Sequence, residues 1–419
     1  MKTMRFTLML AAIAAALVLP MAARDAEHLT VLHTFSGGGG AGDPGTQLVE
    51  DSAGNFYGST LWDGNYEGCS KAGCSVVYRL SPQGTGWTYT VLYEFVGYRQ
   101  QGQEPTQLIL DAAGNLYGEL SAGGAYGAGS VFELSPTASG LWTYTNLYTF
   151  TGGADGNLPS GGLVFDGSGN LYGATAYGGA EEGGQGAVFK LAPNGSGGWT
   201  ESVIYSVSVT SNHPTGPLVF DGSGNLYGVW DGADGVLGGV FELKPSSGGW
   251  TFVSLYSFTG SSDGETPEAG VVRDAAGNLY GTTTYGGAHH LGTVYELSPN
   301  SGGGYTFNLL YTFAGGNGGG NSFNPVTLDA SGTLFGSALG GADNWGVVFE
   351  LSPSSSGWTY GLVHTFTGGA DGGYPGGLIF DAAGNLYGTA VYGAKPGCLN
   401  NSGCGTIFKL SSTAPVGHE

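Results

Sequence analysis

Apolar and polar residues alternate in short runs along most of this 419-residue chain, and clusters of Gly, Ser, Pro, Asn and Asp separate the runs. Period-two runs bounded by turn residues predict β-strands. One such unit contains four runs, which we name strands a to d: Gln107–Asp111, Asn115–Leu120, Ser130–Leu134 and Leu141–Phe150. A tight turn joins a to b, and a Gly-rich loop joins b to c.

The unit recurs seven times, because the phrase Asp-x-x-Gly-Asn-Leu-Tyr-Gly or a close variant appears seven times, 52 to 60 residues apart. Four strands in a repeat of this length predict a propeller blade. Leu29–Phe35 resembles a strand d without its strands a to c, and the last repeat stops after strand c near Leu410. We therefore predict an all-β, seven-bladed β-propeller with four antiparallel strands per blade, in which the N-terminal strand closes the last blade.

The recurrent Asp and Gly have a structural explanation. An Asp side chain can accept hydrogen bonds from backbone N–H groups two or three residues later, and Gly adopts the positive φ that such a turn needs. We therefore interpret the seven aspartates as turn caps rather than as a ring of catalytic or metal-binding acids. The Trp residues that recur on strand d are interpreted as packing residues.

Composition narrows the class of protein. The 84 glycines and 12% aromatic residues are typical of short strands joined by tight turns, and they exclude a disordered chain. The formal net charge of −21 argues against nucleic acid or an anionic membrane surface as a partner.

The N-terminus has the pattern of a secretory signal, with Lys2 and Arg5 before the short apolar stretch Phe6–Leu19. We assign residues 1–23 to a signal peptide, 27–411 to the propeller and 412–419 to a polar tail. The expected protein is secreted or periplasmic, monomeric and without a membrane span.

Four cysteines lie in the b–c loops of the first and last repeats. Two local disulfides, Cys69–Cys74 and Cys398–Cys404, fit an exported protein. Pairing between the two loops is the alternative, because blades one and seven are neighbours in a closed ring. Zinc is disfavoured because no Cys-x-x-Cys spacing is present.

The third repeat, Gly161–Leu191, shows the full pattern Gly-Gly-Leu-x-x-Asp-x-x-Gly-Asn-Leu-Tyr-Gly, then Tyr-Gly-Gly-Ala, then Gly-x-Val-Phe-x-Leu. In these features the chain resembles the bacterial tandem-repeat proteins named for the GloVer motif. The resemblance spans nearly all of the predicted mature chain. It implies an exported propeller and supplies no catalytic residues.

The sequence contains no strong catalytic, cofactor or metal motif. The single Gly-x-Ser-x-Gly string, Gly260–Gly264, lies in a d–a loop without the helix that a nucleophile elbow requires. We therefore expect no cofactor and no metal, and a non-enzymatic protein is favoured.

In a four-stranded blade, the b–c loops and d–a connections share one face, which we call the loop face. Variable loops on a rigid scaffold are where binding usually occurs. This face collects the d–a aspartates Asp155, Asp263 and Asp371 and the candidate ligand-binding residues Trp62, Tyr66, Tyr126, Tyr177, Trp230, Tyr285, His289, Trp345 and Tyr392.

We expect Trp62, Trp230 and Trp345 to be exposed, and the repeat-matched Tyr177, Tyr285 and Tyr392 to seal the blades. Binding of an extracellular glycan or protein is the favoured function. A polysaccharide-acting enzyme with loop-face carboxylates and a purely structural surface component are the alternatives.

Overall fold

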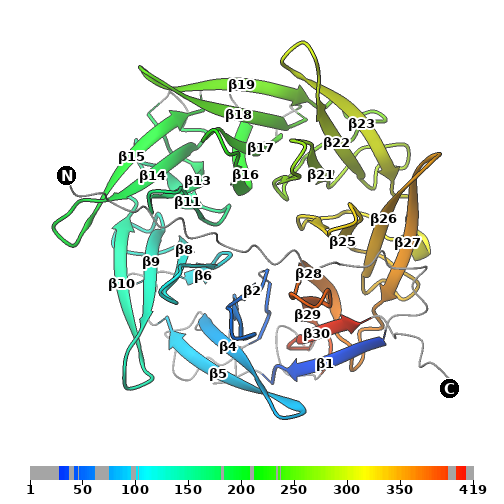
Figure 1. Cartoon of the computed structure of the whole chain (residues 1–419), viewed down its shortest axis with the longest axis horizontal. Helices are drawn as coiled ribbons and strands as arrows, with labels where there is room; N and C mark the ends of the chain where they lie inside the picture. Colours follow the sequence, from blue (N-terminus) through cyan, green and yellow to red (C-terminus); the bar gives the residue numbers. More distant parts are fainter. Residues whose placement is uncertain are drawn as a thin grey trace, which may run out of the picture.

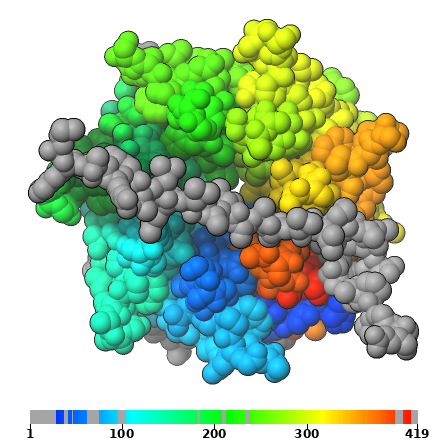
Figure 2. Space-filling view, in the orientation of Figure 1, coloured from blue at the N-terminus to red at the C-terminus, as the bar shows by residue number. Residues whose placement is uncertain are grey.

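The computed structural model describes residues 28–36, 42–45, 47–61, 75–95, 101, 103–180, 184–207, 212–232, 235, 237–394 and 403–411. It is a closed ring of seven β-sheets, as predicted (Figure 1). Over the described residues, the only helix is the 3-10 turn η2 (Gly316–Gly318). The space-filling view follows the blades around the ring in sequence colour and places the first described strand, in blue, beside the last one, in red (Figure 2).

Each blade is an antiparallel sheet with strand a near the axis and strand d outside. Blades 1 to 3 contain β2 (Val49–Glu50), β3 (Phe56–Ser59), β4 (Val76–Gln83) and β5 (Gly86–Glu94); β6 (Gln103–Pro105), β7 (Ile109–Leu110), β8 (Leu116–Ala122), β9 (Ser130–Pro136) and β10 (Trp142–Thr149); and β11 (Asn157–Pro159), β12 (Val164–Phe165), β13 (Leu171–Tyr177), β14 (Ala187–Pro193) and β15 (Trp199–Ser206). In blades 2 and 3 strand a is split in two.

Blades 4 to 6 contain β16 (Asn212–Phe220), β17 (Leu226–Gly232), β18 (Gly239–Ser246) and β19 (Gly249–Ser257); β20 (Val272–Arg273), β21 (Leu279–Thr283), β22 (Thr293–Pro299) and β23 (Tyr305–Thr312); and β24 (Thr327–Leu328), β25 (Leu334–Ala338), β26 (Val347–Ser354) and β27 (Gly357–Thr365). Blade 7 contains β28 (Gly373–Phe380), β29 (Leu386–Tyr392), β30 (Thr406–Ser411) and, as its strand d, β1 (His28–Thr34).

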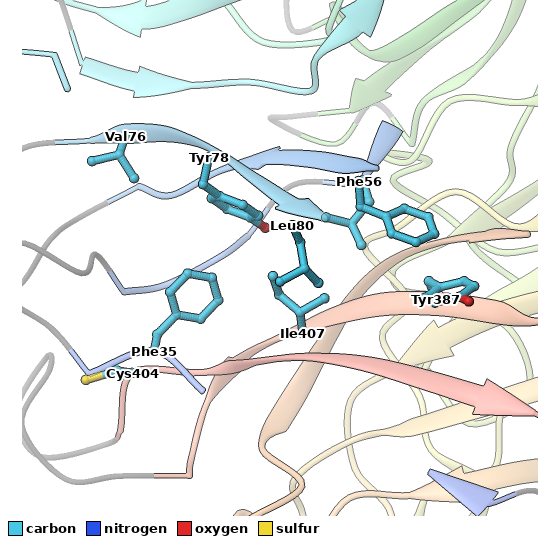
Figure 3. Close-up of a cluster of buried hydrophobic side chains, with 9 residues drawn as sticks. Phe35, Phe56, Val76, Tyr78, Leu80, Tyr387, Cys404 and Ile407 are labelled. Atoms are coloured by element: carbon cyan, nitrogen blue, oxygen red, sulfur yellow. The ribbon is translucent and has the colours of Figure 1, made fainter. Parts of the chain in front are cut away.

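The N-terminal strand closes the ring as predicted. β1 pairs antiparallel with β30 from His28↔Ser411 to Thr34↔Thr406. Phe35, directly after β1, is fully buried in a cluster that joins blade 7 to blade 1 and that includes Tyr78 of blade 1 and Ile407 of blade 7 (Figure 3). Seven such clusters, one per pair of neighbouring blades, make up the core.

The repeated Asp caps the a–b turn, which confirms its structural interpretation. In blade 2, Asp111 Oδ1 accepts hydrogen bonds from the backbone N–H groups of Ala113 and Asn115 at 2.9 and 2.8 Å. Oδ2 accepts from Asn115 Nδ2 at 2.8 Å and from the Tyr117 hydroxyl at 3.2 Å. Burial alone would raise the pKa of Asp111, but these donors stabilise the carboxylate and lower it.

The Gly of Leu-Tyr-Gly makes room for an aromatic ring on the adjacent strand. Gly118 pairs with Phe132 across β8 and β9, and a Cβ on Gly118 would lie 2.7 Å from the Phe132 ring. Strand-d tryptophans pack against the Tyr of the preceding blade, as between Trp142 and Tyr57 with ring centroids 6.1 Å apart. The Tyr and Gly of the repeated phrase thus have packing roles, the Gly within a blade and the Tyr between neighbouring blades.

Candidate functional site

The structure separates the predicted loop-face aromatic residues into exposed and packed rings. Tyr126, Tyr177 and Tyr285 are 67%, 47% and 44% exposed, and His289 is exposed as well. The expectation that Tyr177 and Tyr285 seal the blades is therefore wrong. Trp62 and Tyr66 lie outside the described residues, as do Cys69, Cys74 and Cys398.

The predicted exposure of Trp230 is also wrong, because its side chain is only 7% exposed. Its ring stacks on Phe241 with centroids 6.1 Å apart and lies 5.7 Å from Phe252. A buried ring cannot present a face to a ligand at the surface. Trp230 therefore belongs to the interior of blade 4.

Trp345 and Tyr392 are half-buried and lie in one cluster around Tyr374. The Trp345 and Tyr374 ring centroids are 5.9 Å apart, and those of Tyr374 and Tyr392 are 5.2 Å apart, both edge-on. Trp345 also lies against Gly368 and Gly373, where an added Cβ would meet its ring. Much of each ring is thus used for packing between blades 6 and 7.

The three d–a aspartates close their own loops. Asp263 accepts hydrogen bonds from Thr259 N at 2.9 Å, Thr259 Oγ1 at 2.7 Å and the Tyr256 hydroxyl at 2.9 Å. Asp155 makes the equivalent contacts, and Asp371 has His364 in place of the tyrosine. We assign these carboxylates to loop structure, which corrects their interpretation as groups for a ligand.

A cavity of about 580 Å³ lies at the axis of the ring. Its lining comes from the d–a connections, the inner ends of strands a and the ends of strands b, so it lies toward the loop face. Each blade has a residue equivalent to Thr106 of blade 2, near the inner end of strand a. Six of these seven residues line the cavity: Gly45, Thr106, Ser160, Thr215, Glu268 and Phe323. Four of these six residues are Gly, Ser or Thr, whereas Glu268 and Phe323 carry larger side chains.

Phe323 is 41% exposed although it lies in the cavity wall, so its ring presents a free face there. The adjacent Asn324 is held by two hydrogen bonds from its Nδ2, to Ser337 Oγ and to the Pro375 carbonyl, both at 3.2 Å. An apolar platform beside a fixed amide is typical of a small-ligand site.

Two glutamates add carboxylates to this wall. Glu268 Oε2 accepts a hydrogen bond from Thr284 Oγ1 at 3.0 Å, and Glu104 Oε2 accepts one from Ser121 Oγ at 3.0 Å. Burial raises the pKa of Glu268, the Thr284 hydrogen bond opposes the rise, and the Asp231 carboxylate adds to it. The second oxygen of each glutamate has no hydrogen-bond partner among the described residues.

The cavity is bordered by strained backbone. Six non-glycine residues at equivalent places in the d–a connections have φ between 52° and 60°: Asp43, Glu104, Leu158, Thr266, Asn321 and Tyr374. A non-glycine residue in this region costs about 1 kcal/mol or more, and such strain concentrates at functional sites. The blade 4 equivalent is His213, whose ring lies 4.9 Å from that of Tyr177 and whose Nδ1 lies 3.1 Å from Asp231 Oδ1.

Glu104, Glu268 and Phe323 were not among the residues predicted from the sequence. The signal lay in the alignment of the repeats, because Glu268 and Phe323 stand where the other repeats have Gly, Ser or Thr.

Cys404 is fully buried and disulfide-bonded. The other three cysteines lie outside the described residues, so the pairing stays a prediction. Within the described ranges, no three His, Cys, Asp or Glu residues are grouped as metal ligands would be. No helix in the same ranges is long and apolar enough to cross a membrane.

Comparison with solved structures finds matches at low sequence identity. A protein from Lactobacillus plantarum matches at 14% identity over 77% of this chain and 84% of its own, with a TM-score of 0.50. A calcium-binding regucalcin from Agrobacterium tumefaciens matches at 14% identity over 75% and 91%, with a TM-score of 0.43. The PQQ-bound aldose sugar dehydrogenase from Streptomyces coelicolor matches at 13% identity over 93% and 99%, with a TM-score of 0.45. At such identities the likeness concerns the fold alone.

No curated protein matches the chain. The model of the Gloeobacter/Verrucomicrobia repeat matches residues 21–230, 67–293 and 270–416, which together cover the whole ring. The repeated phrase, the blade that it builds and these matches agree, and the chain belongs to the Gloeobacter/Verrucomicrobia repeat family.

Proposed function

We propose that the protein is an exported, non-enzymatic propeller that binds an extracellular glycan in the axial cavity on its loop face. The observation that carries the proposal is the Phe323 ring, which is 41% exposed in a cavity lined mainly by small and polar side chains. Water against an aromatic face is unfavourable, so a partner with an apolar face gains from covering it.

A sugar ring matches this wall chemically. Its C–H face can stack on Phe323, while its hydroxyl groups can donate to the free oxygens of Glu104 and Glu268. A volume of about 580 Å³ lies within the range of about 300–1,000 Å³ that is typical of small-ligand sites. The exposed Tyr177 and Tyr285 on the same face offer further stacking surfaces for a longer chain.

Substitution of the platform tests the proposal. Phe323→Ala should weaken binding to the recognised polysaccharide at least tenfold, measured by pull-down on insoluble polysaccharides and by affinity electrophoresis in soluble ones. Leu309→Ala is the matched control, because Leu309 is similarly exposed but lies on the outer strand β23. Equal binding by both variants, or no binding to any glycan of a broad panel, would contradict the proposal.

A polysaccharide-acting enzyme is the second candidate, and the raised pKa of Glu268 favours it. A carboxyl group whose pKa is raised by burial holds its proton to a higher pH and can act as a general acid toward a glycosidic oxygen. Release of reducing ends from a bound polysaccharide, lost in Glu268→Gln, would identify an enzyme. Binding without such release supports the non-enzymatic function.

Export is part of the proposal. The positively charged N-terminus and the following apolar stretch support it. N-terminal sequencing of the protein recovered from outside the cytoplasm should give a start near residue 24, and an intact Met1 on the mature protein would contradict export.

A further inference from the structure

Blades 3 and 4 differ from the other blades at the a–b turn, on the face opposite the loop face. In these two blades the repeated Asp follows a phenylalanine and precedes a glycine, in Phe165-Asp166-Gly167 and Phe220-Asp221-Gly222. In the other five repeats the residue after the Asp is Ser or Ala, and only the seventh also has Phe before it. The interface between blades 3 and 4 is therefore the one where both neighbours add a ring and omit a side chain.

A pocket of about 360 Å³ lies at this interface. Its lining comes from the two a–b turns, from Tyr172 of blade 3, and from Pro245 and Trp250 of blade 4. The volume is within the range of about 300–1,000 Å³ that is typical of small-ligand sites. The pocket shares no lining residue with the axial cavity, so it is a separate site.

Four aromatic rings contribute to the walls. Phe220 stands edge-on to Tyr172, with centroids 5.0 Å apart and planes 84° apart, and Trp250 does so at 6.0 Å and 69°. Phe165 packs edge-on against Tyr117 of blade 2. Phe165, Phe220 and Trp250 are each partly exposed, and all three line the pocket. Rings at steep angles to one another form a cage rather than a flat platform.

Two carboxylates add negative charge to this cage. Asp166 accepts hydrogen bonds from the backbone N–H groups of Ser168 and Asn170, both at 2.9 Å, from Asn170 Nδ2 at 2.7 Å and from the Tyr172 hydroxyl at 3.2 Å. Asp221 makes the same four contacts in its own turn. Burial alone would raise the pKa of each carboxyl group, but these donors lower it, so both groups are ionised at neutral pH.

The lysines of these two blades leave the lining negative. Lys244 Nζ is paired with Glu242 Oε2 at 3.0 Å, and Lys190 Nζ lies 5.5 Å from the centroid of the Tyr172 ring. Neither lysine lines the pocket, so the lining contains two carboxylates and no cation. The position of Lys190 also shows that this group of rings accepts a cation beside it.

We infer that the pocket between blades 3 and 4 binds a quaternary ammonium group, such as the trimethylammonium group of choline. The negative faces of aromatic rings attract such a cation. A quaternary ammonium has no N–H to donate, so it gains from the charge of Asp166 and Asp221 although their oxygens already accept two hydrogen bonds each. A primary ammonium would bring donors that these occupied oxygens cannot satisfy.

Choline and its neutral carbon isostere, in which a tert-butyl group replaces the trimethylammonium group, are the matched probes. They differ in charge and hardly in shape. Titration calorimetry and saturation-transfer NMR on the full chain at low salt should show choline binding about tenfold more tightly than the isostere. Vesicles of phosphatidylcholine form a further arm: binding to them as well as to choline identifies a lipid headgroup as the source, and binding to choline alone identifies a free solute.

Two pairs of variants test the cage and its charge. Trp250→Leu removes one wall and should weaken choline binding about tenfold. Trp142→Leu is the control, because Trp142 has the same place on strand d of blade 2. Gly222→Lys should weaken choline binding about threefold relative to Gly222→Gln and leave the isostere unchanged. A side chain fits at Gly222, because an added Cβ would meet nothing within 4 Å.

A melting curve of each variant reports whether it folds. If Trp250→Leu does not fold, the two Gly222 variants still decide the question, since they differ from each other in charge. The inference is overturned if the wild type binds choline no more tightly than the isostere. It is also overturned if folded Trp250→Leu and Gly222→Lys both bind choline as the wild type does.

Discussion

Glu119 is the buried residue that should make the stability of this propeller depend most clearly on pH. It occupies the position after Leu-Tyr-Gly in blade 2, where the other blades have Ser, Ala, Val or Thr. Its side chain is completely buried and reaches the next blade, where Oε2 accepts a hydrogen bond from Gly162 N at 2.8 Å. Oε2 also accepts from Thr106 Oγ1 at 3.1 Å, and Oε1 has no partner.

The magnitude follows from the shift in the pKa. Burial raises the pKa of Glu119 from 4.5 to about 7, against the opposing hydrogen bonds from Gly162 and Thr106. The folded state thus holds a proton that the unfolded state releases between pH 4.5 and 7. Stability from this group is fully present below pH 4.5 and is lost as the pH rises through about 7, with a total of about 3 kcal/mol.

Glu119→Gln keeps the shape of the protonated side chain and cannot ionise. Unfolding by urea, measured from pH 4 to pH 8, should show nearly equal stability of wild type and variant at pH 4. By pH 8 the variant should be about 3 kcal/mol more stable. Other titrating groups cancel in this difference. A difference that stays constant across the range would show that the buried carboxyl group is not protonated in the folded protein.

Three further predictions test the ring. Deleting Leu29–Phe35 should lower the melting temperature strongly because it opens blade 7, whereas trimming 412–419 should not; equal effects would argue against closure by β1. Trp230→Ala should destabilise by about 3–5 kcal/mol, whereas Tyr285→Ala should leave the melting temperature nearly unchanged, and the reverse order would contradict their burial. Peptide mapping without reduction should recover two disulfides, and a free thiol or a link between the two loops would refute the expected pairs Cys69–Cys74 and Cys398–Cys404.

The features that the sequence predicted well are local. Asp111 and the groups that it binds lie within six residues, so the turn could be deduced from one repeat. The closure by β1 was also predictable, because the last repeat lacks a strand d and the first predicted strand resembles one.

The features that the sequence predicted poorly depend on neighbours that are distant in the chain. Trp230 is buried because Val207, 23 residues earlier, is small and because Gly239 has no side chain. The axial cavity depends on which residue of each strand a turns toward the axis. Neither relation has a periodic signature within a single repeat.

Glu268 and Phe323 occupy the position that is equivalent to Thr106 in blade 2. Substitution at this position can alter ligand binding with the least loss of folding stability. Glu268 and Phe323 border an open cavity, whereas the burial of Trp230 required changes at two other positions. A double variant, Glu268→Thr with Phe323→Ser, would give blades 5 and 6 the lining that other blades have. We expect its free energy of unfolding to stay within about 1 kcal/mol of that of the wild type, because neither side chain fills a core. We also expect it to lose glycan binding. A large loss of stability in urea unfolding would show instead that these two side chains hold the blades together.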